Sequence, residues 1–322
     1  MTLFRLGYVA MSVHLQNSSP SQTMTFKRFN EIGDEEAAIH KLERIAKANL
    51  TNCLRLLKHN KAYDITFFRL SSKLIPLATH DALKGWNYRE AVQQELRALG
   101  DYAKQNKMRL GFHPDHFVVL NTPEKEKLKF SLKTLQYHHN LLKGMDMTTA
   151  HRCVLHLGGK YEDKGQSLER FITNWAFVPN RLQNMIILEN DDKIYTMNDI
   201  LYVCEKLNVP HVFDLHHHMA NYEEENWEKQ WDRILGTWSH SEHPIKMHIS
   251  SPKSESQFRA HADYIDPNMF LRFANTVKGS TPQIDCMIEA KEKDGALFQL
   301  VEELKKHPDV EMVDQASFYI KG

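Results

Sequence analysis

Residues 185–218 read MIILENDDKIYTMNDILYVCEKLNVPHVFDLHHH, in which two short apolar runs flank an amphipathic segment. The runs 185–190 and 211–218 are rich in Ile, Leu, Val and Phe and stop at polar residues, which predicts β-strands. Residues 197–208 carry apolar side chains at helical spacing. Because strand, helix and strand follow one another, this stretch predicts one unit of a parallel α/β sheet.

The same alternation continues along the whole chain. Asp34 is the expected N-cap of the first helix. The expected strands are residues 5–12, 65–72, 109–115, 152–159, 185–190, 211–218, 245–251 and 284–291. The expected helices, one after each strand, are residues 34–60, 88–105, 124–142, 166–182, 197–208, 223–238, 263–275 and 295–306.

Eight strand-and-helix units, with no linker rich in Ser or Gly between them, fit a closed (β/α)8 barrel, the TIM barrel. We therefore predict an α/β protein in which residues 1–322 form a single barrel domain. An open, doubly wound sheet is the alternative fold. The lengths of the units vary too much for a solenoid.

Composition describes an ordinary globular protein, since 42% of the 322 residues are hydrophobic and 25% are charged. The 41 basic residues balance 41 acidic ones, so affinity for a polyanion has to come from a local patch. The cysteines Cys53, Cys153, Cys204 and Cys286 form no CxxC pair, which argues against a zinc ribbon or a disulfide framework and favours the cytoplasm. No run approaches about 18 apolar residues and no signal peptide is recognisable, so no membrane association is expected.

Imidazoles and carboxylates gather at the ends of the predicted strands. In a (β/α)8 barrel these ends converge on the face that carries active sites. Side chains alternate along a strand, so Lys246 and His248 share one face, as do Ile187 and Glu189. The imidazoles and carboxylates near strand ends are His113, His156, Glu189, Asp214, His217, His248 and Glu289.

These residue types together form the mixed nitrogen and oxygen donor set that Mn²⁺, Zn²⁺ or Fe²⁺ accepts. No cysteine thiolate is placed among them, which favours a hydrolytic metal cluster over a structural zinc site. A single histidine at a strand end is usually a hydrogen-bonded core residue. Six strands that each end with a potential ligand indicate a common site.

Three consecutive histidines, His216, His217 and His218, follow Asp214 two-thirds of the way along the chain. A purification tag lies at a terminus, so this run is not one. Strict alternation separates His217 from the other two, but a turn at the strand end breaks that rule. The pattern alone leaves open which histidine binds a metal and which hydrogen-bonds to a ligand or lies in the loop.

Nine stretches of the chain resemble the UV DNA damage endonucleases, a family of metal-dependent (β/α)8 repair nucleases related in fold to endonuclease IV. None of the stretches is specific alone, but their combination is. In family order from residue 6 to residue 294 they are LGYV, FRLSSKLIP, GFHPDHFVVL, VLHLGGKYEDK, LENDD, FDLHHH, KMHISSP, HADYI and MIEAKEKD.

This resemblance implies a cluster of up to three divalent ions, with manganese expected first and zinc, magnesium or cobalt as alternatives. His261 enters only through the resemblance. A carboxylated lysine in the family matches Lys246, and a carbamate would turn a repelled ammonium into an anionic ligand. The implied metal ligands are His113, His156, Glu189, Asp214, His217, His248, His261, Glu289 and the carboxylated Lys246, and the implied catalytic residues are Glu189, Glu289, Lys246 and His248.

The implied substrate is double-stranded DNA that carries pyrimidine dimers or 6-4 photoproducts, with abasic sites as a second target. Cleavage is expected at the phosphodiester immediately 5′ to the lesion, after the damaged dinucleotide has left the base stack. Tyr8, His116 and Phe117 match the side chains that fill the resulting gap. The family pattern has glutamine and tyrosine where this chain has His116 and Phe117, so Phe117 can stack but lacks a hydroxyl. No obligate protein partner is expected, and the candidate phosphate contacts are Lys160, Lys164, Lys253, Arg259 and Lys291.

Two other functions share the same pattern of residues. A sugar isomerase of the xylose-isomerase type also places His, Glu and Asp around two metals inside a (β/α)8 barrel, and fold alone cannot separate it from a nuclease. The Tyr8 and His116-Phe117 set and the carbamate-type Lys246 favour the nuclease. A non-catalytic DNA-binding barrel is the second alternative, and its metal coordination would be saturated.

Overall fold

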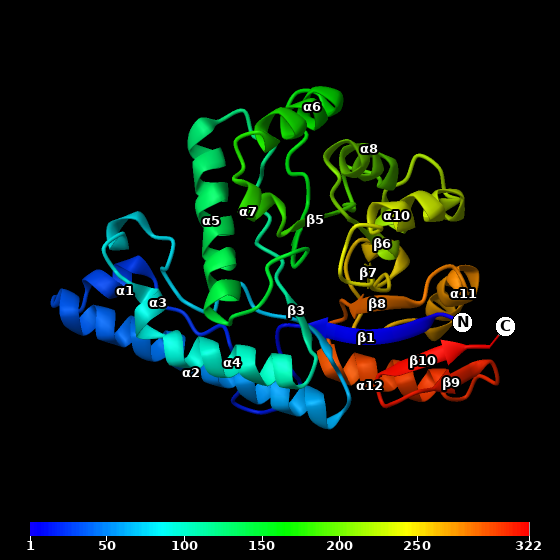
Figure 1. Ribbon diagram of the computed structural model, residues 1–322, viewed down its shortest axis with the longest axis horizontal. Helices are drawn as coiled ribbons and strands as arrows, with labels where there is room; N and C mark the ends of the chain where they lie inside the picture. The colour runs from blue at the N-terminus through cyan, green and yellow to red at the C-terminus, as the bar shows by residue number, and fades with distance from the viewer. Residues whose placement is uncertain (322) are drawn as a thin grey trace.

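Eight short strands form the centre of the computed structural model, which describes residues 1–321. Helices lie around these strands (Figure 1). Neighbouring strands in the order β3-β2-β1-β8-β7-β6-β5-β4 are all parallel. The eight strands are β1 (Leu3–Val9), β2 (Phe67–Arg69), β3 (Arg109–Gly111), β4 (Cys153–Leu155), β5 (Ile186–Glu189), β6 (His211–Asp214), β7 (Ile245–Ile249) and β8 (Gln283–Ile288).

The two ends of this strand order meet just beyond β3 and at β4. A parallel bridge joins Phe112 to Cys153 there. The Phe112 amide donates to the Arg152 carbonyl at 2.8 Å, and the Val154 amide donates to the Phe112 carbonyl at 3.0 Å. The strands therefore form a nearly closed barrel, which confirms the predicted (β/α)8 fold and rules out the open sheet.

Helices follow each strand, as the spacing predicts. The N-cap prediction for the first long helix is confirmed, because the Asp34 carboxylate accepts a hydrogen bond from the Ala37 amide at 3.0 Å. The α-helices are α1 (Phe26–Asn30), α2 (Glu35–Ala62), α3 (Tyr88–Ala91), α4 (Gln93–Gln105), α5 (Lys125–Gly144), α6 (Lys164–Trp175), α7 (Asn180–Gln183), α8 (Met197–Leu207), α9 (Leu215–Ala220), α10 (Trp231–Thr237), α11 (Pro267–Val277) and α12 (Lys293–Leu304). Short 3₁₀ helices are η1 (Asp81–Leu83), η2 (Trp227–Gln230) and η3 (Glu255–Gln257).

Two expected helices are each divided into two. The helix expected at 88–105 is interrupted at Val92, whose ψ of 18° is not helical and whose side chain is buried. The helix expected at 166–182 ends at Trp175, and Pro179 precedes the next short helix. A proline disfavours helical conformation in the residue before it, which explains the second break.

Other expected elements also differ in their bounds. The strand expected at 211–218 stops at Asp214, and the histidines that follow belong to α9. The helix expected at 223–238 is limited to α10 and the preceding η2. The helix expected at 263–275 begins at Pro267, because the Asp266 side chain caps it by accepting from the Asn268 amide at 2.9 Å.

A C-terminal hairpin extends the sheet in a way that the alternation did not predict. Strands β9 (Val310–Met312) and β10 (Ser317–Ile320) pair antiparallel, and β10 pairs antiparallel with the first half of β1. Figure 1 shows β10 beside β1, with both chain ends on the same side of the molecule. The rings of Phe318 and Phe4 stack with centroids 5.3 Å apart. The hairpin therefore covers the first residues of β1.

The end of the barrel opposite the site is closed by buried ion pairs. Asp285 in β8 accepts from Arg5 in β1 at 2.8 Å and from Arg109 in β3 at 2.7 Å. One large apolar cluster contains side chains from both the strands and the helices, and it packs the helices against the barrel.

Within residues 1–321, the four cysteines are buried and unpaired, and no helix is both long and apolar enough to cross a membrane.

Candidate active site

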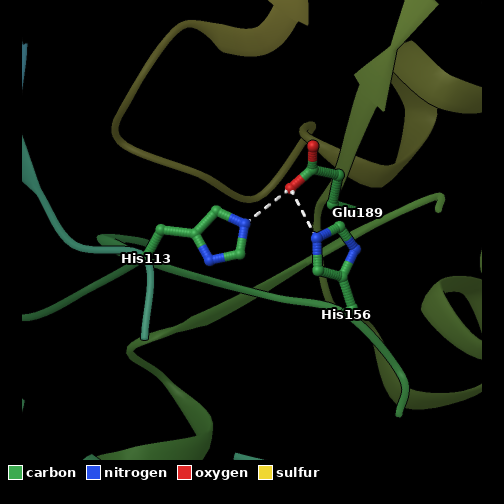
Figure 2. A group of neighbouring side chains, drawn as sticks. All are labelled: His113, His156 and Glu189. Atoms are coloured by element: carbon green, nitrogen blue, oxygen red, sulfur yellow. Dashed lines mark hydrogen bonds and ion pairs between the residues drawn. The ribbon is translucent and has the colours of Figure 1, made fainter. Parts of the chain in front are cut away.

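Glu189, the last residue of β5, is the centre of a cluster of imidazoles at the carboxyl ends of the strands, and it is 1% exposed. Its Oε2 lies 3.0 Å from His113 Nε2 and 3.7 Å from His156 Nε2. Figure 2 shows both imidazoles directed at this oxygen. Its Oε1 lies 2.8 Å from His248 Nδ1 and 3.5 Å from His217 Nδ1. Four imidazoles from four different strand-to-helix connections or strand ends therefore surround one carboxylate.

Asp214 brings His217 into this cluster by starting a helix directly after β6. Its Oδ1 accepts from the His217 amide at 2.7 Å, which caps α9. The ring Nδ1 of His217 then lies 3.6 Å from Asp214 Oδ2 and 2.9 Å from the Asn190 carbonyl. The Asn190 side chain also bonds to both the amide and the carbonyl of Asp214, each at 2.9 Å, so the ends of β5 and β6 are held together.

The other two histidines of the triple run point elsewhere. His216 Nδ1 lies 2.6 Å from Ser250 Oγ, and its Nε2 lies 2.6 Å from the Phe258 carbonyl. His218 Nε2 lies 3.0 Å from the Glu225 carbonyl, which is within hydrogen-bond distance. Of the three, His217 is thus the one whose ring faces the carboxylates.

Glu289 forms a second carboxylate centre directly after β8. Its Oε1 lies 3.3 Å from His248 Nδ1, and its Oε2 lies 4.0 Å from His261 Nδ1. Arg69, the last residue of β2, donates to Glu289 Oε1. The sequence interpretation missed Arg69 because it counted only imidazoles and carboxylates at strand ends, although Arg69 lies at such an end.

The electrostatics of the cluster keep its carboxylates ionised. Burial by itself raises the pKa of Glu189, but His248 and His156 hold that pKa well below its usual range. Burial likewise raises the pKa of Glu289, and Arg69 and His248 lower it. Ionised carboxylates are the form that binds metal.

The histidines of the cluster differ in their pKa values. Burial lowers the pKa of His156 and of His248. Burial also lowers the pKa of His217, but Asp214 and Glu189 outweigh it and raise that pKa to about 9. A cation that binds beside His217 therefore has to displace a proton from it.

The donors present fit a divalent cation. Two sets have ligand atoms that all lie within 4.8 Å of one another, namely His113, His156 and Glu189, and Glu189, Asp214 and His217. Asp214 Oδ2 and His248 Nε2 are buried and have no hydrogen-bond partner within residues 1–321. Because an unpaired buried polar atom is costly, a cation among these donors would satisfy atoms that the protein leaves open.

Lys246 lies in β7, two residues before His248, and is 3% exposed. Its ammonium lies 5.7 Å from the centroid of the Phe67 ring. Burial, together with Arg109 and Arg69, lowers its pKa to about 7. The side chain thus lies inside the barrel, as the alternation with His248 predicts, and its carboxylation stays a prediction.

The loop after β3 carries the expected His116-Phe117 pair beside a large cavity. Phe117 is 66% exposed, and its ring centroid lies 4.0 Å from that of His116. A cavity of about 1110 Å³ is lined by both residues and also by the cluster residues His156 and His217. An exposed aromatic side chain therefore stands next to the space that leads to the cluster.

Tyr8 does not line this cavity, and its expected contact with DNA stays a prediction. Its side chain is 0% exposed and faces the helix layer, where its hydroxyl donates to Asn60 Oδ1 at 2.5 Å and its ring packs edge-on against Phe68. The adjacent Gly7 and Val9 take the opposite face of β1. Tyr8 in this structure is a core residue.

The candidate phosphate contacts fall into two groups. Lys160, Lys253 and Arg259 are exposed in loops that follow β4 and β7. Lys164 instead pairs with Asp199 at 2.7 Å and with Glu223 at 3.1 Å. Lys291 lies 3.9 Å from Asp263. The first three side chains are thus the more available for an anionic partner.

Comparison with known proteins decides the family. Residues 4–319 match the family UV-endonuclease UvdE. This chain belongs to that family. A curated relative, the UV DNA damage endonuclease of Halalkalibacterium halodurans, is 50% identical over 314 residues, which cover 97% of this chain and 98% of the relative. Membership of a nuclease family decides against the sugar isomerase and the non-catalytic barrel.

Solved structures agree with the fold. The crystal structure of SacUVDE matches with a TM-score of 0.83 at 29% identity and covers 94% of this chain and 98% of that chain. Endonuclease IV from Thermus thermophilus matches with a TM-score of 0.55 at 12% identity and covers 94% of this chain and 100% of that chain. The second likeness concerns the barrel fold alone.

Proposed function

We propose that this UvdE-family protein nicks double-stranded DNA immediately 5′ to UV photoproducts, with divalent metal ions as cofactor and abasic sites as a second target. The observation that carries this proposal is the convergence of His113, His156, His217 and His248 on Glu189 at the mouth of the barrel. Half of the chain's residues are identical to those of a UV DNA damage endonuclease over nearly its full length.

The metal ions would be held by the two carboxylate centres. Glu189 lies between four imidazoles, and Glu289 lies between His248 and His261. When bound, such ions activate water as a nucleophile and polarise the scissile phosphate. Manganese is the first candidate that the family suggests, and nitrogen and oxygen donors without a thiolate accept it.

Arg69 is positioned to orient Glu289 and to add positive charge beside the reacting phosphate. Its guanidinium is the one charged group from β2 that bonds to the cluster's second carboxylate. A fixed cation next to an oxyanion stabilises the charge that develops on the phosphate. We assign Arg69 the role of a positioning residue for Glu289.

The cavity of about 1110 Å³ is the proposed place for the extruded dinucleotide. It is lined by His156 and His217 on the cluster side and by Phe117, Phe130 and Tyr161 elsewhere. Aromatic side chains stack on bases whatever their sequence. Phe117, exposed at the edge of this cavity, would insert into the gap that the lesion leaves in the duplex.

Lys246 is proposed to carry a carboxyl group on its Nζ. A buried ammonium beside metal ions is repelled, whereas a carbamate is an anionic ligand. Mass spectrometry of the intact native protein, compared with the Lys246→Met variant, tests this. A mass increase equal to one CO₂ in the native protein alone supports the modification, and equal agreement of both proteins with their unmodified masses overturns it.

A plasmid assay tests the function. Supercoiled plasmid, UV-irradiated or not, is incubated with the protein in Mn²⁺ or in EDTA. We expect nicking only of irradiated plasmid in Mn²⁺. Equal nicking of both plasmids would discard damage recognition, and equal nicking in EDTA would discard the metal requirement. A labelled duplex with a single pyrimidine dimer then shows whether the cut lies immediately 5′ to it.

A further inference from the structure

The closed end of the barrel, opposite the candidate active site, holds more buried positive charge than its carboxylates balance. Arg5 in β1, Arg109 in β3 and Arg152, directly before β4, bring guanidinium groups there. Asp285 accepts from Arg5 at 2.8 Å and from Arg109 at 2.7 Å. In the described part of the chain Arg152 forms no ion pair, and the exposed Glu242 acts on it from farther away. A buried charge without a partner is rare in proteins.

Arg109 and Arg152 stand on the two sides of the junction between β3 and β4. Strand β3 begins at Arg109, and β4 begins one residue after Arg152. One bridge, from Phe112 to Cys153, joins the two strands, and Arg152 Nη1 adds a bond to the Leu110 carbonyl at 2.7 Å. Burial and then the charge of Arg109 lower the pKa of Arg152 to about 10. The two guanidinium groups therefore repel each other at a junction with little strand pairing.

Both guanidinium groups also have a buried nitrogen without a partner. Arg109 is 6% exposed and Arg152 is 7% exposed. Within residues 1–321, neither Arg109 Nη2 nor Arg152 Nε has a hydrogen-bond partner, and neither has Nε2 of His243 in the loop before β7. Burial, Arg109 and Arg152 lower the pKa of His243 to about 3, so its ring is neutral and can carry its one proton on Nε2. Three open donors thus belong to one positively charged group of side chains.

The other contacts of Arg109 hold its guanidinium in one position. Its Nη1 donates to Asp285 at 2.7 Å and to the Pro244 carbonyl at 2.8 Å. Its guanidinium carbon lies 5.5 Å from the centroids of the Phe67 and Trp238 rings. A guanidinium fixed in this way presents its free Nη2 without further ordering, which reduces the entropy cost of binding a ligand.

We propose that the closed end of the barrel binds a small inorganic anion, a halide or an oxyanion no larger than phosphate, between Arg109 and Arg152. The anion accepts from Arg109 Nη2 and Arg152 Nε through charge-assisted hydrogen bonds, and His243 is a third contact. A water molecule would satisfy the same N–H groups but would leave the charges unbalanced. A metal cation would be repelled by both guanidinium groups.

The bound anion would hold the starts of β3 and β4 together. The candidate metal ligands His113 and His156 follow the same two strands at the other end of the barrel. The junction would thus be fastened by a cation at its open end and by an anion at its closed end. This inference goes beyond the proposed nuclease function and does not depend on it, because the anion site needs neither DNA nor metal.

Thermal melting of the full chain in three sodium salts tests the anion site. Chloride, phosphate and gluconate are compared at equal ionic strength and pH 7, without DNA. Gluconate is the reference, because it is too bulky for a buried site. The proteins are the unaltered chain, Arg152→Gln, which removes the unpaired charge, and the matched control Arg97→Gln, which makes the same change at an exposed position on α4.

In the unaltered chain and in Arg97→Gln, the Tm in saturating chloride or phosphate should exceed the Tm in gluconate by about 5 °C. In Arg152→Gln this difference should vanish. A rise in chloride alone assigns a halide, and a rise in phosphate alone assigns an oxyanion. Equal Tm values of the unaltered chain in all three salts overturn the inference. So does a difference of the same size in all three proteins, since that is a general salt effect.

Crystals of the unaltered chain give an answer even if Arg152→Gln does not fold. One crystal is soaked in bromide and measured at the bromine absorption edge, and another is soaked in phosphate. An anomalous peak or phosphate density within hydrogen-bond distance of Arg109 Nη2 and Arg152 Nε supports the inference. Absence of both anions from this position overturns it.

Discussion

Single side chains at strand ends form the candidate site of this protein, and Glu189 shows how. In the sequence it is one glutamate after four apolar residues, but in the fold it receives imidazoles from as far as 76 positions away in the chain. The strand-end rule found it because parallel strands bring their carboxyl ends to one face. The same rule could not find His261, which lies in a loop after β7.

Glu289→Gln tests the second carboxylate centre. The amide keeps the shape of the side chain but removes the negative charge that would bind a cation, and it leaves Arg69 without its anion. We expect nicking of irradiated plasmid to fall by about 100-fold or more while DNA binding persists. Gel-shift titration and the plasmid assay measure the two effects. Glu302→Gln, an exposed change on α12, is the control, and full activity of Glu289→Gln would remove Glu289 from the ligand set.

Substitutions of Arg69 test whether its positioning of Glu289 depends on the geometry or on the charge of the guanidinium. Arg69→Gln removes both the cation and its bond to Glu289, and we expect cutting to fall about 10- to 100-fold. Arg69→Lys keeps the charge but not the planar fork, so we expect an intermediate loss. The apparent Mn²⁺ affinity, read from thermal shifts without DNA, should weaken in the same order. Normal metal affinity in both variants would show that Arg69 does not orient Glu289.

Tyr8 marks the limit of sequence reasoning at this scale. Side chains alternate along a strand, so Tyr8 and its neighbour Gly7 face opposite sides of β1. This alternation does not tell which of the two sides faces the helices. The hydrogen bond from Tyr8 to Asn60 in α2 shows that Tyr8 faces the helices, and no local pattern predicts a contact 52 residues away. Arg69 was missed for a different reason, since arginine is not a metal ligand.

Whole elements were easier to predict than their bounds. All eight barrel strands lie within or overlap the expected ranges, because apolar runs and their order along the chain are local properties. The start of α9 was not predicted, since it depends on the Asp214 side chain turning back to cap the helix. The hairpin β9–β10 was also missed, because its first strand is only three residues long and exposes Glu311.

Asp285 connects strands β1, β3 and β8, and it links the stability of the barrel to pH. Burial raises its pKa, but Arg109 and Arg5 outweigh burial and lower it below the ordinary value. A depressed folded-state pKa contributes stability that is present above the unfolded pKa, about 3.9, and is lost as pH falls through the folded pKa. Removal of the acid leaves Arg109 buried with an uncompensated charge.

We therefore expect Asp285→Asn to lower the free energy of unfolding by about 3–5 kcal/mol at pH 7. Urea titrations between pH 3 and pH 7 should show a smaller loss of stability on acidification in the variant than in the parent. Asp232→Asn, at an exposed position on α10, is the control. Parallel pH profiles for parent and Asp285→Asn would contradict this role.

At the scale of the whole molecule, the C-terminal hairpin joins the end of the chain to its beginning. Phe318 in β10 is fully buried between Phe4 in β1 and Phe270 in α11. Phe318→Ala should lower the free energy of unfolding by about 3–5 kcal/mol, because a large cavity opens there. Val313→Ala, 53% exposed in the same hairpin, should change it by less than about 0.5 kcal/mol. Urea titration of both variants checks the difference.

The weakest point of the barrel lies where a metal ion would bind across it. Strands β1 and β8 pair through six register positions, but β3 and β4 are joined only by the bridge from Phe112 to Cys153. His113 follows one side of this seam and His156 follows the other, and both face Glu189. A cation held by all three would therefore fasten the seam.

Hydrogen exchange measures this effect without any substrate. At about 100 times its Kd, Mn²⁺ should stabilise the folded state by about 2.7 kcal/mol. Peptides that contain the amides of Phe112 and Val154 should exchange more slowly in Mn²⁺ than in EDTA, whereas β8 is already protected by both neighbours and should change less. In the His156→Ala variant this difference between seam and β8 should disappear. An equal slowing of both regions would mean that the metal stabilises the barrel globally and not through its seam.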